Sequence, residues 1–304
     1  MGIEVLSQPC QPGQTLQFTF QNALQNWVVG LGYFSLSYAT GSNHWVETLS
    51  ISLQTNLPAP AAASNVLEVI VQAQLMDHSG HTVDATASRI WVVCVAVTGS
   101  SDSNTVLANV TGVTPRQPQE VQLPGAQAGS YTVLTTCLSG LDLSYDTTDH
   151  MFQGATGGCG INPQASGEGL LNATANIWDS SGNQAVTASI DAGVLATVDN
   201  PSPFMVQQVN AYNGANVPAL TFPSAVERAV AMIQSFNVQY ASGDHGVAVI
   251  TVGCPNLSSS GSTVNLGAVA TTTDDDGNDS NDGLSYVNLL VVAVPQSSST
   301  AGRP

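Results

Sequence analysis

A threefold internal repeat is the feature that most restricts how this chain can fold. Three segments carry alternating apolar positions that end in a tyrosine, at Tyr38, Tyr145 and Tyr240. A polar turn follows each tyrosine and leads to an Asn-His or Asp-His pair, at His44, His150 and His245. These histidines recur at intervals of roughly 100 residues, so we treat the chain as three related units in tandem.

A second landmark accompanies the first in all three units. A strand-like run is followed by a turn of the form Asp-x-x-Gly, at 77–80, 179–182 and 274–277, and then by a long apolar run. Two landmarks that recur in the same order make chance similarity a poor explanation.

The local patterns predict an all-β protein. Alternation with a period of two, enrichment in Val, Thr, Phe and Tyr, and the Asp-x-x-Gly turns are typical of strands and hairpins. We therefore expect three tandem antiparallel β-sandwich modules, immunoglobulin-like or related, at 1–104, 105–203 and 204–304, the last with a flexible tail. Ser224 to Glu227 has the form of a capping box and could begin a short helix, although the repeat favours loop or strand there.

Composition excludes several functions. Only 8% of residues are charged, none is lysine, and the net charge is −17. A chain with four cationic side chains cannot neutralise many phosphates, so we expect neither nucleic-acid binding nor attraction to anionic membranes. The hydrophobic content of 43% is enough to build a core.

The compartment stays undetermined. No apolar run reaches the length of a membrane span, and the first residues resemble no signal peptide. We expect a soluble protein that is cytosolic at synthesis, with export without a signal or incorporation into a particle left open. Five widely spaced cysteines without a Cys-x-x-Cys motif argue against a disulfide framework or a zinc site, and a Cys137–Cys159 bond stays open.

The recurrent histidines allow two interpretations. If the units surround a pseudo-threefold axis, His44, His150 and His245 could converge on one metal ion or anion. Alternatively, each Asn/Asp-His pair caps a turn and the ring packs on its strand, which we favour. In the first unit alone, His78 and His81 form a His-x-x-His pair, but two ligands are too few for a transition-metal site, so a solvated turn is the simpler interpretation.

An acidic segment at 274–283 is the other candidate site. Oxygen-rich loops suit hard cations, so we expect calcium, if it binds, to be held here, although the segment lacks the spacing of an EF-hand. The candidate ligands are Asp274, Asp275, Asp276, Asp279, Asn281 and Asp282.

No hydrolase, metalloprotease, phosphate-binding or dinucleotide-binding motif is present, so the sequence predicts no enzyme. A weakly charged polar surface on repeated β units indicates a structural, self-assembling protein, such as a subunit of a filament, fibre, sheath or virion-like particle. The partners would be further copies or other protein subunits. The alternative is an adhesin or lectin-like protein that binds glycans with the help of calcium.

Overall fold

Strands form every regular element that the structure describes. The computed structural model describes residues 2–39, 44–58, 64–100, 103–124, 131–280 and 283–296. Within these ranges there is no helix, and all strand pairings are antiparallel. The predicted all-β class is therefore confirmed, and the segment after Ser224 forms strand, as the repeat favoured, instead of the short helix that its capping-box pattern allowed. That segment begins strand β15 (Val226–Gln239), which pairs with a strand on each side.

The first two units each contribute six strands in the same order. The first unit has β1 (Gly2–Cys10), β2 (Thr15–Thr19), β3 (Leu24–Ser37), β4 (Thr48–Asn56), β5 (Val66–Met76) and β6 (Arg89–Thr98). The second unit has β7 (Thr105–Val113), β8 (Gln119–Gln122), β9 (Val133–Ser144), β10 (Gly154–Pro163), β11 (Glu168–Trp178) and β12 (Thr187–Thr197).

The third unit repeats this order with its fourth and fifth strands each broken in two. Its strands are β13 (Met205–Tyr212), β14 (Leu220–Thr221), β15, β16 (Val249–Gly253), β17 (Leu257–Ser260), β18 (Thr263–Leu266), β19 (Val269–Thr273) and β20 (Tyr286–Pro295). The break after β16 falls at Gly253, whose φ of 121° is outside the range of ordinary strand residues.

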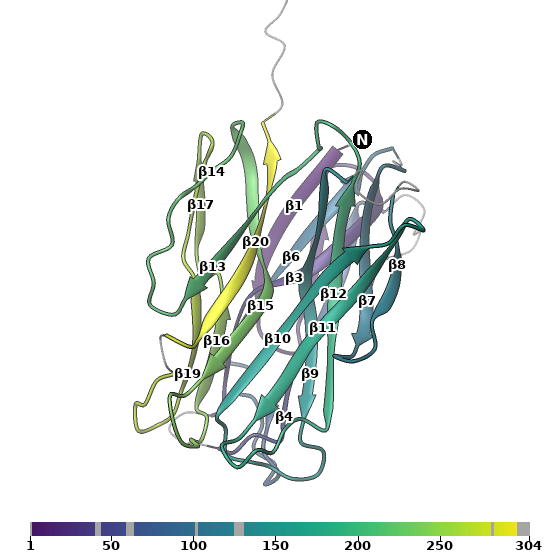
Figure 1. Ribbon diagram of the computed structural model, residues 1–304. Helices are drawn as coiled ribbons and strands as arrows, with labels where there is room; N and C mark the ends of the chain where they lie inside the picture. Colours follow the sequence, from purple (N-terminus) through teal and green to yellow (C-terminus); the bar gives the residue numbers. More distant parts are fainter. Residues whose placement is uncertain are drawn as a thin grey trace, which may run out of the picture.

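The sheets do not follow the unit boundaries. One sheet has the order β2-β5-β4-β9-β12-β7, and joins the first unit to the second where β4 pairs with β9. Another has the order β13-β20-β15-β10-β11-β8, and joins the second unit to the third. A third, β1-β6-β3-β16-β19, joins the third unit back to the first, while β14, β18 and β17 form a small separate sheet. The exchange of strands is therefore a closed cycle (Figure 1).

Three separate sandwiches are not confirmed by this topology. After its third strand, each unit crosses over and pairs its fourth strand with the third strand of a different unit. The boundaries expected near residues 104 and 203 fall between strands β6 and β7 and between β12 and β13. The segments they divide are repeats of sequence and strand order, but each one shares its sheets with both others.

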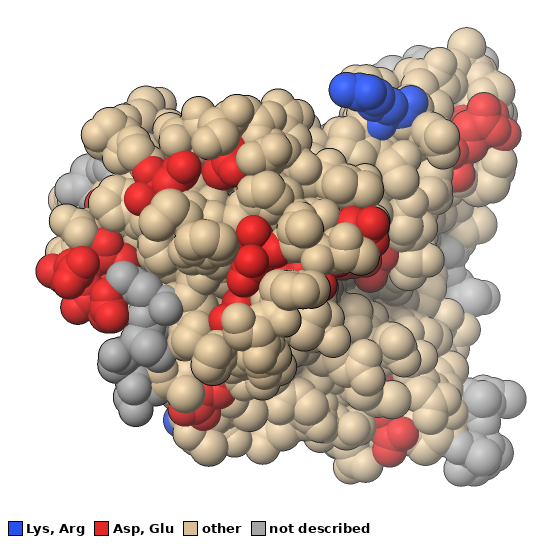
Figure 2. Space-filling model, turned by 90° about the horizontal axis from the view of Figure 1, so that it is seen from below, with Lys and Arg blue, Asp and Glu red and all other residues tan. Residues whose placement is uncertain are grey.

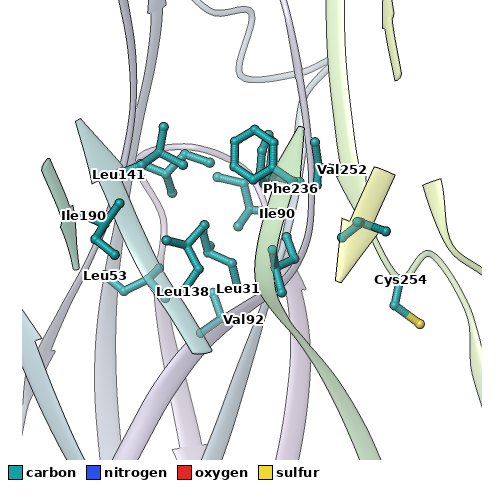
Figure 3. Close-up of a cluster of buried hydrophobic side chains, with 14 of the residues drawn as sticks. Leu31, Leu53, Ile90, Val92, Leu138, Leu141, Ile190, Phe236, Val252 and Cys254 are labelled. Atoms are coloured by element: carbon teal, nitrogen blue, oxygen red, sulfur yellow. The ribbon is translucent and has the colours of Figure 1, made fainter. Parts of the chain in front are cut away.

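The core lies where the third strands of the three units face one another. A side chain added at Gly30 would lie 2.9 Å from Cys137 Sγ and 3.0 Å from Met232 Sδ, so all three units meet at this point. Phe34 and Phe236 pack edge to face with ring centres 5.7 Å apart. Figure 3 shows buried side chains from all three units in one cluster. The central strands β3, β6, β9 and β15 are buried on both faces over runs of consecutive residues, because each lies between other layers of the structure.

The described part of the chain contains no helix with the length and apolar character needed to cross a membrane.

Candidate functional site

The three histidine loops meet at the lower end of the molecule in Figure 1. Each loop forms a short antiparallel bridge to the next, and every bridge consists of two backbone hydrogen bonds of 2.8–3.2 Å. The three bridges close into a triangle and join His44 to Val247, Val46 to His150, and Phe152 to His245. This end of the molecule is thus sealed by backbone pairing between units.

Each repeat histidine ring has two contacts that recur in all three units. The ring packs on the tyrosine of its own unit, with centres 4.7, 4.5 and 4.2 Å apart in chain order. Its Nδ1 lies 3.0, 3.1 and 3.0 Å from a carboxylate oxygen of the Asp-x-x-Gly turn. Each unit therefore contains a group of one tyrosine, one histidine and one aspartate: Tyr38–His44–Asp77, Tyr145–His150–Asp179 and Tyr240–His245–Asp274.

The aspartate holds the turn together, as the second unit shows. Asp179 Oδ1 accepts a hydrogen bond of 2.8 Å from the backbone N–H of Asn183, and Oδ2 accepts one of 2.6 Å from its side-chain Nδ2. Gly182 has a φ of 93°, which the turn requires and a larger residue would resist. Burial alone would raise the pKa of Asp179, but the hydrogen bonds from Asn183 and the nearby His150 outweigh it and lower the pKa.

The acid that precedes the second and the third repeat histidine caps a turn in another unit. Asp149 accepts a hydrogen bond of 3.2 Å from the backbone N–H of His78. Asp244 accepts one of 2.5 Å from the backbone N–H of Ser180 and one of 2.7 Å from its hydroxyl. The corresponding Asn43 lies outside the described residues.

The repeat histidines do not form a shared metal site. Among the described residues, three metal-ligating side chains come together only at His44, Asp77 and His81. Each repeat histidine instead faces the aspartate of its own unit, as expected for a ring that braces a turn. Sequence reasoning missed these aspartates as partners, although the recurrence of both landmarks at matching spacing was the signal that pairs them.

The acidic segment is divided between two environments. Asp274 is buried and its carboxylate is occupied by His245 and Asn278, whereas Asp275, Asp276 and Asp279 are exposed. Asn281 and Asp282 lie outside the described residues. Figure 2 shows acidic side chains in several groups over this end of the molecule, with few cationic ones among them. Calcium binding by this segment stays a prediction.

All five cysteines are free thiols. The Cys159 thiol donates a hydrogen bond of 3.3 Å to the backbone carbonyl of Cys137, so the two residues are neighbours without being bonded. Burial raises the pKa of Cys159 to about 12, which favours the protonated thiol over the reactive thiolate.

No protein-family model matches this chain, and no curated protein matches it significantly.

Proposed function

We propose that this protein is a non-enzymatic structural subunit that assembles into a filament, fibre, sheath or virion-like particle. The observation that carries the proposal is the closed exchange of strands among the three units. No unit can leave the assembly without breaking backbone pairings to both of the others. Such mutual locking suits a protein that must keep its shape under load or outside the protection of a cell.

The surface supports the same proposal. Charged residues are 8% of the chain, so neighbouring copies can approach without desolvating many ions. Each large sheet ends in strands that pair on one side only, for example β2 and β7 or β13 and β8. Backbone groups on such edges can pair with another chain. The three repeat histidines at this end each face the aspartate of an Asp-x-x-Gly turn, which is a structural use of groups that enzymes use in catalysis.

Sedimentation velocity and electron microscopy test this proposal. We expect the purified chain to form larger species or ordered particles as its concentration rises, with and without calcium. A protein that stays strictly monomeric under all these conditions would refute self-assembly.

A second candidate, glycan binding, is favoured by one surface feature. The outer face of the sheet that contains β4, β5, β9 and β12 has a shallow depression lined mainly by hydroxyl, amide and carboxylate side chains. They include Ser50, Gln72, Gln74, Asp142 and Asp191. Such groups supply the hydrogen bonds that sugars need, and a glycan array with and without calcium tests this function. Binding that a Gln74→Ala variant loses would favour the glycan-binding candidate over assembly alone.

A further inference from the structure

The turn of the first unit differs from the other two in one chemically important position. In the second and third units the residue after the turn glycine is asparagine, Asn183 or Asn278, but in the first unit it is His81. The replacement preserves the local hydrogen bonds. The backbone N–H of His81 donates to Asp77 Oδ1 at 2.8 Å, and its Nδ1 lies 2.6 Å from Oδ2, the distances that Asn183 makes with Asp179.

The substitution brings a second imidazole against the repeat histidine. The His44 and His81 rings lie 3.9 Å apart, and the Nδ1 atoms of both lie within 3.0 Å of the same oxygen, Asp77 Oδ2. The ligand atoms of the three residues all lie within 4.8 Å of one another. His44 belongs to the loop after β3, and Asp77 and His81 belong to the hairpin between β5 and β6. The three side chains are therefore brought together by the tertiary fold and do not come from one continuous segment.

We propose that His44, Asp77 and His81 form a binding site for one divalent transition-metal ion of the Zn²⁺ type. Two imidazoles and one carboxylate, with water completing the coordination, are a ligand set that zinc adopts in proteins. Zinc bonds of about 2 Å place neighbouring ligands of a tetrahedral site about 3.3 Å apart. The two Nδ1 atoms lie at comparable distances of 3.0 and 2.6 Å from Asp77 Oδ2. Both imidazoles bind as neutral ligands, with the Nδ1 proton moving to Nε2.

The other charged groups nearby fit this assignment. Asp77 is buried, and its carboxylate is the only anion among the three proposed ligands. His78, the other histidine of this turn, is exposed, and its Nδ1 lies 3.3 Å from Glu47 instead of Asp77. The metal-binding pair is therefore His44 with His81, and the adjacent His78–His81 pair in the sequence is not the ligand set.

The equivalent places in the other units supply internal controls. His150 with Asp179, and His245 with Asp274, offer one imidazole and one carboxylate each, and the third group is an asparagine amide. A neutral amide is a poor ligand for zinc. The proposal therefore assigns one ion per chain, in the first unit alone, and its function would be to join the loop after β3 to the β5–β6 hairpin.

To test the proposal, the full chain is first freed of metal with a chelator and then titrated with Zn²⁺ alone. Binding is measured by calorimetry, and the number of ions bound per chain is measured as the zinc that stays with the protein after dialysis. We expect one Zn²⁺ per chain and a roughly 100-fold rise in the ratio of folded to unfolded protein when zinc is present at 100 times its Kd. His81→Asn gives the first unit the turn sequence of the others and preserves its hydrogen bonds. We expect this variant to fold. We expect its affinity for zinc to fall by far more than the roughly 10-fold loss that follows removal of a residue contacting a metal ligand from outside the site.

The reciprocal variant tests sufficiency. Asn183→His places a second imidazole beside His150 and Asp179, and we expect it to raise the stoichiometry to two. His78→Ala should retain the wild-type affinity. Absence of zinc binding by the wild-type chain up to ~1 mM would overturn the proposal. So would binding that survives in His81→Asn, or binding that His78→Ala abolishes, since each places the ion elsewhere.

Discussion

Truncation of Phe236 to alanine tests whether the three units unfold as one. Phe236 is fully buried on β15, packs edge to face on Phe34 of the first unit, and lies against Gly157 of the second. Loss of a buried phenylalanine costs about 3–5 kcal/mol, which includes both the lost burial and the cavity left behind. If the urea dependence of the unfolding free energy is about 3 kcal/mol/M, the midpoint falls by about 1 M or somewhat more.

Tryptophan fluorescence provides a probe that excludes the mutated unit. The four tryptophans, Trp27, Trp45, Trp91 and Trp178, all lie in the first two units. Strand exchange predicts that Phe236→Ala lowers the fluorescence midpoint by the same amount as the midpoint measured by circular dichroism. If the chain does not refold, the rates of unfolding at a fixed urea concentration serve in place of the midpoints, and the two signals should accelerate together.

The control is Val186→Ala, which truncates an apolar side chain that is 71% exposed and should change the free energy of unfolding by less than about 0.5 kcal/mol. The reasoning is refuted if Phe236→Ala produces an early partial loss of dichroism while the fluorescence transition stays where it was. That result would mean that the third unit unfolds alone.

Three further predictions follow from the packing and the charges. Folding lowers the pKa of Asp179, so its carboxylate stabilises the folded chain above the unfolded pKa near 3.8, and this stabilisation is lost as the pH falls through the folded pKa. The melting temperatures of the wild type and of Asp179→Asn should therefore converge in acid. A methyl group at Gly193 would collide with Val28 and lie 2.6 Å from Cys137 Sγ, so Gly193→Ala should cost about 1–3 kcal/mol in urea unfolding, whereas Gly160→Ala, which meets nothing within 4 Å, should cost much less. Burial raises the pKa of four thiols, those of Cys10, Cys94, Cys137 and Cys254. A thiol reagent at pH 8 should therefore label none of these four rapidly until the chain is unfolded, and their rapid labelling in the folded protein would contradict their placement.

The sequence was sufficient to predict the class of fold and the equivalence of the repeats. Alternation of apolar residues up to Tyr38, Tyr145 and Tyr240 reflects burial of one face of a strand, which is a local property. The three tyrosines do have matching surroundings, because each packs on the histidine that follows it.

The pairing of strands could not be predicted in this way. The residues of β4 alternate in the same manner whether their neighbour is a strand of their own unit or, as observed, β9 of the next. Periodicity shows which face of a strand is buried but not which strand lies beside it. The cluster at His44 and His81 was equally hidden, since these residues are distant in the sequence and meet only because the loop after β3 lies beside the β5–β6 hairpin in the fold.

The pairing of β16 with β3 has a consequence for how this chain is made. The first unit leaves the ribosome with one side of β3 open, and its proper neighbour is among the last segments to be synthesised. Until then the nascent polypeptide carries a long apolar strand that is paired on the β6 side only, a condition that favours aggregation. A message cut short within the third unit would thus damage the first as well. Placing all three copies on one polypeptide ensures that the missing neighbour arrives at high local concentration, whatever the abundance of the protein.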